Sequence, residues 1–153
     1  SVDDSEWIEI LNRTDEPLQL DGVSLWYEGA LKISFTAVCL PARSALTLYN
    51  LKVSAEWVWS TPPIGDLTTQ EDATFALTNS RPIALELRHD AITLNNFEAA
   101  TALIGSGISA NRNPDATSDG GISLHNGVPG ALGSQQSPGL CVNGHRFENL
   151  CMP

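Results

Sequence analysis

The chain has 153 residues, of which 42% are hydrophobic and 17% are charged, a composition typical of a folded globular domain rather than of a disordered segment. Its 18 acidic residues against 8 lysines and arginines give a net charge of −10. Because contacts between cations and phosphates supply most of the affinity for nucleic acids, and anionic membrane surfaces also attract cations, both classes of partner are disfavoured.

Short segments of alternating apolar and polar residues predict β-strands through the first part of the chain. They span residues 7–11, 18–20, 23–27, 33–40 and 45–49. At Asp21-Gly22 we expect a β-bulge that shifts the register, so that Val23 and Leu25 continue the apolar side. The pattern then weakens between residues 50 and 72, and no apolar run approaches the ~20 residues that a membrane-spanning helix needs.

The alternation returns at residues 75–77 and 83–88, and His89-Asp90 predicts a tight turn into a strand that begins at Ile92. No segment of ten or more residues keeps helical spacing, and residues 96–104 are expected to be coil or a short helix. The succession of short strands predicts an all-β sandwich, with residues 1–153 as one domain, a core over 7–143 and a tail over 144–153. The expected core residues are Trp7 or Ile8, Leu25, Phe35, Leu48, Leu77, Leu85 and Leu87.

Residues 105–144 are rich in glycine and poor in large apolar side chains. The segment runs in order through Gly107-Ile108-Ser109, Arg112, Pro114-Asp115, Asp119-Gly120, Ser137-Pro138-Gly139 and Asn143. Together with Trp7-Ile8-Glu9-Ile10-Leu11-Asn12 near the start, this order and spacing resembles the lamin-tail domain family, whose members occur at the end of nuclear lamins and in secreted bacterial proteins. The family's usual Trp in the short strand after the Asp-Gly turn is absent here, and Ile122 or Leu124 takes that place.

The resemblance implies an immunoglobulin-like antiparallel β-sandwich with a long, ordered C-terminal return loop. It also implies a non-catalytic accessory module that mediates attachment or protein–protein contact in a secreted or cell-envelope protein. The partner would then be a protein or a cell-surface component, bound by an exposed sheet edge or by the long loop.

Three cysteines are present, at positions 39, 141 and 151. Cys141 and Cys151 bracket a short polar loop, and a disulfide between them would hold the C-terminal end in an oxidising compartment. Cys39 lies on the apolar face of an alternating segment and is expected to be a buried free thiol. An odd number of cysteines leaves other pairings open.

No pattern for catalysis or for zinc stands out. His89 and His145 fall in predicted turns or tails and are expected to be exposed, and His125 also precedes a turn. The chain has no Gly-x-Ser-x-Gly nucleophile motif and no His/Cys spacing typical of zinc. We therefore expect neither an enzyme nor a cofactor.

Two weaker patterns point to ligands. Oxygen donors gather in residues 111–120, which makes Asp115 and Asp119 candidate calcium ligands, although a salt bridge from Arg112 within the loop explains the same charges. Trp57 and Trp59 share a side if their segment is extended, and two neighbouring indoles could form a carbohydrate-binding platform or cover the core. A carbohydrate-binding module, with calcium as a structural ion, is thus the alternative function.

Overall fold

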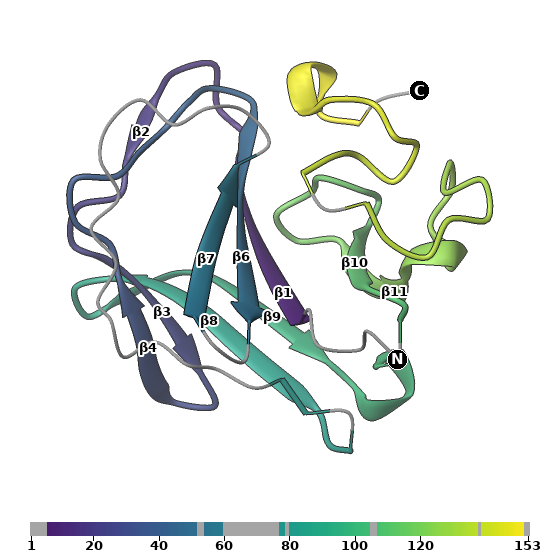
Figure 1. Cartoon of the computed structure of the whole chain (residues 1–153), viewed down its shortest axis with the longest axis horizontal. Coiled ribbons are helices and arrows are strands. Elements are labelled where there is room, and N and C mark those ends of the chain that lie inside the picture. Colours follow the sequence, from purple (N-terminus) through teal and green to yellow (C-terminus); the bar gives the residue numbers. More distant parts are fainter. Residues whose placement is uncertain are drawn as a thin grey trace.

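The computed structural model describes residues 6–51, 54–59, 77–78, 80–104, 107–137 and 139–151 (Figure 1). In this part of the chain the regular structure is almost entirely β, as predicted, with three short 3-10 turns and no α-helix. The strands of the first part are β1 (Glu6–Asn12), β2 (Leu18–Gln19), β3 (Val23–Tyr27), β4 (Ala30–Ser34), β5 (Cys39–Leu40), β6 (Ser44–Leu51), β7 (Ser54–Trp59), β8 (Ile83–His89) and β9 (Ile92–Ala99). The C-terminal part contains η1 (Thr101–Leu103), β10 (Ala110–Asn113), β11 (Gly121–Leu124), η2 (His125–Gly127) and η3 (Phe147–Asn149).

Two antiparallel sheets form a sandwich. One has three strands in the order β1-β6-β7, and the other has four in the order β4-β3-β8-β9. β2 and β5 form a separate two-stranded pair. In β3, the alternate residues Val23, Leu25 and Tyr27 are buried, as expected of a strand with one face toward a core. The all-β sandwich that the alternation predicts is therefore confirmed.

The core between the sheets is formed by residues from both. Ten buried apolar residues make it up: Ile8, Leu20, Val23, Leu25, Ile33, Phe35, Val38, Leu40, Leu46 and Leu48. Of the predicted core residues, Ile8, Leu25, Phe35 and Leu48 are buried, whereas Leu77, Leu85 and Leu87 are partly buried and pack against this cluster. The last three lie on one side of the sandwich, where the core is less completely covered.

The predicted bulge at Asp21-Gly22 is instead a turn. Gly22 adopts a left-handed φ of 76°, and the Val23 amide donates to the Leu20 carbonyl at 2.9 Å. The turn carries the chain from β2 into β3, which belong to different sheets. A Cβ at position 22 would lie 3.1 Å from His89 Nε2, so the site favours glycine on both counts. The register of β3 against β4 shifts further along, between Leu25 and Trp26.

Two further predictions about strands were wrong. The expected strand over residues 33–40 is divided into β4 and β5, because the left-handed φ of 54° at Ala37 interrupts it. The Ala37 amide donates to Asp21 Oδ1, which holds the backbone in this conformation. Of residues 96–104, expected to be coil or a short helix, residues 96–99 instead continue β9, which pairs with β8 as far as Ala99, whereas Thr101–Leu103 form the short turn η1. The strand predicted at 75–77 lies largely outside the described residues.

The C-terminal third adds a further layer against the three-stranded sheet. Figure 1 shows it in green to yellow, beside β1. Phe147 packs with Ala45 of β6 and with Ala116 and Cys141 in a second buried cluster, against which Leu11 of β1 also packs. The glycine-rich segment thus packs against the sandwich as expected. It also contains two strands, β10 and β11, which pair antiparallel. The alternation predicted neither of them, whereas the resemblance implied a short strand at Ile122 or Leu124, and both residues lie in β11.

Candidate functional site

The two tryptophans of the predicted platform belong to β7. The backbone register places Trp57 opposite Leu48 and Trp59 opposite Leu46, both of which are core residues of β6. Their side chains lie outside the described part of the structure. The carbohydrate platform therefore stays a prediction.

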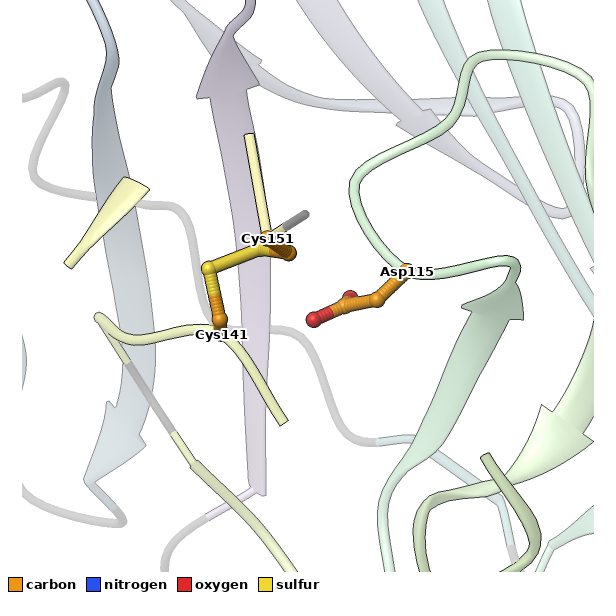
Figure 2. Close-up of side chains that lie close together, drawn as sticks. All are labelled: Asp115, Cys141 and Cys151. Carbon is orange, nitrogen blue, oxygen red and sulfur yellow. A yellow bond between two sulfur atoms is a disulfide. The ribbon is translucent and has the colours of Figure 1, made fainter. Parts of the chain in front are cut away.

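Asp115, one of the two candidate calcium ligands, is a structural acceptor. Its Oδ1 accepts from the Ala116 amide at 2.9 Å, and its Oδ2 accepts from the Val142 amide at 2.7 Å. Figure 2 shows its carboxylate facing the Cys141–Cys151 pair, and the three ligand atoms lie within 4.8 Å of one another. Because both sulfurs are joined in a disulfide, they are not thiolate ligands. Asp119, the other candidate, is exposed on the same loop.

Arg112 does not form the salt bridge that the sequence suggested. Its guanidinium donates to the Gly120 carbonyl at 2.9 Å, to Asn95 Oδ1 at 3.2 Å and to the Asn96 carbonyl. It also lies 5.5 Å from the centre of the Phe97 ring. Apart from the bond to Gly120, all of these contacts are with β9. Arg112 thus joins the C-terminal layer to the four-stranded sheet.

The predicted disulfide between Cys141 and Cys151 is confirmed. Cys141 is fully buried in the cluster around Phe147, so the bridge closes the C-terminal loop onto the second core. Cys39 is a free thiol, as predicted, but it is only partly buried at the start of β5.

The three histidines differ sharply in their surroundings. His89 and His145 are exposed, as predicted. His125, at the start of η2, is completely buried. Its Nε2 lies 2.8 Å from Ser134 Oγ, and its Nδ1 lies 3.2 Å from Asn111 Oδ1. Burial lowers the pKa of His125 below its usual value, so the ring is neutral at neutral pH.

This Ser–His–Asn arrangement resembles the parts of a nucleophile and base, but its serine has a second partner. The Ser134 hydroxyl donates to the Ala131 carbonyl at 2.7 Å, so this carbonyl competes with His125 Nε2 for its single proton. The contacts of the imidazole join the loop that carries Ser134 to β10 and η2.

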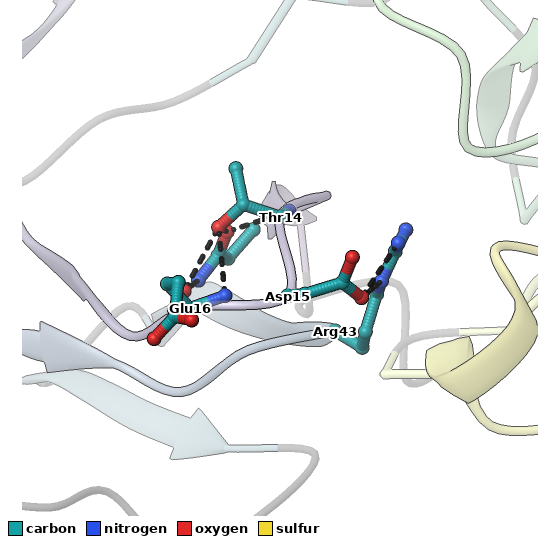
Figure 3. A network of polar contacts seen from close by, with 5 residues as sticks. Thr14, Asp15, Glu16 and Arg43 are labelled. Carbon is teal, nitrogen blue, oxygen red and sulfur yellow. Dashed lines mark hydrogen bonds and ion pairs between the residues drawn. The ribbon is translucent and has the colours of Figure 1, made fainter.

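The Asn12-Arg13-Thr14 sequon is not available for glycosylation in the folded protein. Asn12 is 1% exposed, and its Nδ2 donates to the carbonyls of Glu16, Leu40 and Pro41 at 2.9–3.0 Å. Figure 3 shows the surrounding turn, in which the Thr14 hydroxyl donates to the Glu16 carbonyl and Asp15 pairs with Arg43 at 2.8 Å. The asparagine joins the end of β1 to the loop after β5.

Glu9 is a carboxyl group with unusual surroundings, on the outward side of β1. Its Oε2 accepts from the Gly139 amide at 2.5 Å and from Thr47 Oγ1 at 3.1 Å. Burial under the C-terminal layer raises the pKa of Glu9 to about 7; these two hydrogen bonds oppose the rise, and the negative charge of Asp115 adds to it. No cation pairs with Glu9 among the described residues.

Replacement of Glu9 by glutamine should stabilise the protein above neutral pH. The pKa of Glu9 is higher in the folded state than the usual 4.5, so protonation of Glu9 favours the folded state. This contribution to stability is fully present below about pH 4.5 and is lost as the pH rises through 7. Water in the open cavity can reach the carboxyl group and reduces the cost of its charge. We therefore expect the substitution to raise the free energy of unfolding by only about 1–2 kcal/mol at pH 8, and hardly at all at pH 4.5. Urea unfolding between pH 4.5 and 8 measures the effect. The control is Glu98→Gln, which makes the same change at an exposed position of β9. A Glu9→Gln protein less stable than wild type at pH 8 would contradict it.

A cavity of about 500 Å³ opens beside β1. One side is apolar and includes Ile10, Leu85 and Phe97, from between the two sheets. The other side includes Glu9 and Asp115, from under the C-terminal layer. The cavity is of a size that proteins use for ligands, and it combines apolar walls with a few polar groups.

Sequence reasoning passed over Glu9, although β1 carried a signal. Trp7, Glu9 and Leu11 alternate with the core-facing residues, so two large apolar side chains flank a carboxylate on the outward side. An outward face with that composition is expected to be covered by another part of the chain. Only the fold reveals that Gln136, Gly139 and Phe147 supply contacts on this side.

Comparison with protein families, with curated proteins and with solved structures finds no match for this chain. Within the described residues, no helix has the length and apolar character needed to cross a membrane.

Proposed function

We propose that this protein is a non-catalytic accessory module that mediates attachment or protein–protein contact. The observation that carries the proposal is the open cavity beside β1, which is bordered by apolar side chains of the sandwich. The described side chains best suited to chemistry are committed to holding the fold: His125 and Ser134 join two segments, and Asp115 accepts backbone amides. A binding space that combines apolar walls with a few polar groups fits a binding module.

We further propose that the module works in a secreted or cell-envelope protein. The disulfide of Cys141 and Cys151 is of the kind that persists in oxidising compartments. The resemblance to lamin-tail domains, which accompany secreted and cell-surface proteins, is in keeping with this location and with an immunoglobulin-like sandwich.

The alternative is a carbohydrate-binding module that uses Trp57 and Trp59. Titration against a panel of polysaccharides, with wild type and a Trp57→Ala variant, separates the two functions. Saturable polysaccharide binding that the substitution abolishes would favour the alternative.

The test of the leading proposal is cross-linking of the tagged protein on the surface of the cells that produce it. A protein recovered in this way is then purified and titrated calorimetrically against the module. We expect saturable binding with a fixed stoichiometry. Turnover of ester, phosphodiester or glycoside substrates by the purified protein would overturn the non-catalytic assignment.

The same protein should not bind duplex DNA at physiological salt. With 8 cations against 18 anions, binding would require the arginines to gather on one face. Arg43, Arg81 and Arg88 instead pair with Asp15, Glu28 and Glu86. An electrophoretic shift assay at low and moderate salt checks this, and a complex that survives moderate salt would contradict it.

A further inference from the structure

The cavity runs along the backbone edge of β1 rather than against one of its faces. Successive residues of a strand point to opposite faces, yet all of residues 7–11 border the cavity. β1 pairs with β6 on one side, and no backbone hydrogen bond crosses its other edge among the residues that the structure describes. The amides and carbonyls of that edge are therefore available to a strand placed in the cavity.

A segment of the C-terminal layer also borders the cavity. All of residues 107–112 line it, and within this segment β10 pairs with β11. Figure 1 shows β10 in the C-terminal layer, beside β1. The edge of β1 and this segment thus both border a space of about 500 Å³.

The two sheets also differ in size at this place. The three-stranded sheet ends at β1, whereas the four-stranded sheet continues past β8 to β9. Leu85, Leu87 and Phe97, which belong to β8 and β9, remain only partly buried and border the cavity. An extended segment paired with β1 would lie over these side chains and complete their burial.

The charges around the cavity indicate what such a segment should carry. Glu9 and Asp115 both border the cavity, and neither pairs with a cation among the described residues. Two arginines also border it: Arg112, whose guanidinium is engaged by β9 and Gly120, and Arg13, at the end of β1 away from Trp7. The whole chain has a net charge of −10, which attracts a basic partner at long range.

We propose that this cavity accepts an extended segment of a partner protein as an added β-strand, and that this segment alternates apolar residues with lysine or arginine. The inference rests on the proposed function, because it states how a contact module holds its partner. In a strand added to β1, every second side chain faces Leu85 and Leu87, and the side chains between them face Glu9 and Asp115. Backbone pairing supplies affinity, and the alternation supplies selectivity.

The first experiment uses a fluorescent seven-residue peptide that alternates valine and lysine, titrated against the intact protein by anisotropy. We expect saturable binding with one peptide per protein. A peptide with glutamate in place of lysine should bind at least tenfold more weakly, and so should one with N-methyl groups on alternate amides, which cannot pair as a strand. Hydrogen exchange should slow in residues 7–11 and 107–112 when the peptide binds, and should stay unchanged in β4, at the far edge of the sheet.

The second experiment compares two variants with the same change of charge. At pH 8, above the pKa of about 7 of Glu9, Glu9→Gln should weaken binding of the lysine peptide three- to tenfold, and this loss should shrink at high salt. Asp119→Asn, which alters an exposed carboxylate on the loop of Asp115 but outside the cavity, should leave binding unchanged. Because Glu9→Gln is expected to stabilise the fold, weaker binding cannot be ascribed to unfolding.

Several outcomes would overturn the inference. They are the absence of saturable binding, equal affinity for the N-methylated peptide and unchanged affinity in Glu9→Gln. Slower hydrogen exchange in other residues, but not in 7–11 and 107–112, would also overturn it. Dimerisation of the protein with β1 protected would show that a second copy occupies the cavity instead. If the cross-linked partner binds without competition from the peptide, strand addition fails while the contact function stands. If the peptide binds but no protein partner is found, the contact function lacks support although the cavity accepts strands.

Discussion

Replacement of Asn12 by alanine is expected to lower the free energy of unfolding by about 3–4 kcal/mol. The side chain makes hydrogen bonds through both its nitrogen and its oxygen, and one of its acceptors, the Leu40 carbonyl, is buried with it. Alanine removes these bonds and leaves polar groups without partners in a space that is too enclosed for easy hydration; each such group costs about 1–3 kcal/mol. Urea unfolding at pH 7 measures the loss.

Two further variants separate the causes. Asn12→Asp keeps the shape of the side chain and the oxygen that accepts from the Thr14 amide. It places a carboxylate oxygen against three carbonyl oxygens, which repel it, so we expect this variant to be at least as unstable as the alanine variant. Thr14→Ser keeps a hydroxyl at the position that contacts Glu16, so it should lose less than about 1 kcal/mol. A loss below 1 kcal/mol for Asn12→Ala would mean that the network adds little to stability.

Loss of the disulfide should cost about 3 kcal/mol. Cys141 and Cys151 are separated by 10 residues, and the loop-closure model assigns roughly this free energy to a loop of that length. Cys151→Ser is the better variant, because Cys141 is completely buried and a serine there would add an unpaired hydroxyl. Unfolding in urea with and without a reductant gives the value.

The free thiol provides the control for this measurement. Cys39→Ala should respond to the reductant as the wild type does, because Cys39 takes no part in the bridge. Cys151→Ser should not respond to it at all. A stability of the wild type that does not change on full reduction would show that packing around Phe147 alone holds the C-terminal loop.

Much of the sandwich could be predicted because local pattern and burial agree there. In β3, Val23, Leu25 and Tyr27 are buried and alternate with less buried residues, just as their spacing implies. The pattern failed where a tertiary contact decides the conformation. Ala37 has no propensity for a left-handed φ, and it adopts one where Asp21 holds its amide. Asn95 and Asn96 disfavour strands by composition, but pairing with β8 keeps them extended.

The candidate site was harder to predict, since its parts come from distant segments. The disulfide could be inferred, because two cysteines close together in a polar tail have few other uses. His125 could not be placed, since its surroundings combine Ser109 and Asn111, at β10, with Ser134 from a later loop. The Arg112 interaction was misassigned because nearby carboxylates are visible in the sequence, whereas the carbonyls of Gly120 and Asn96 act as acceptors only once β9 lies alongside.

The contact between Glu9 and Gly139 spans 130 residues, and it has a consequence for the order of folding. During synthesis β1 leaves the ribosome before the segment that covers its outward face. Until that segment follows, Trp7 and Leu11 lack the contacts supplied by Gln136 and Phe147. A nascent chain arrested before residue 136, or a fragment cleaved there, would display an apolar strand face and be prone to aggregate. Protection of β1 from aggregation thus depends on residues far away in the sequence.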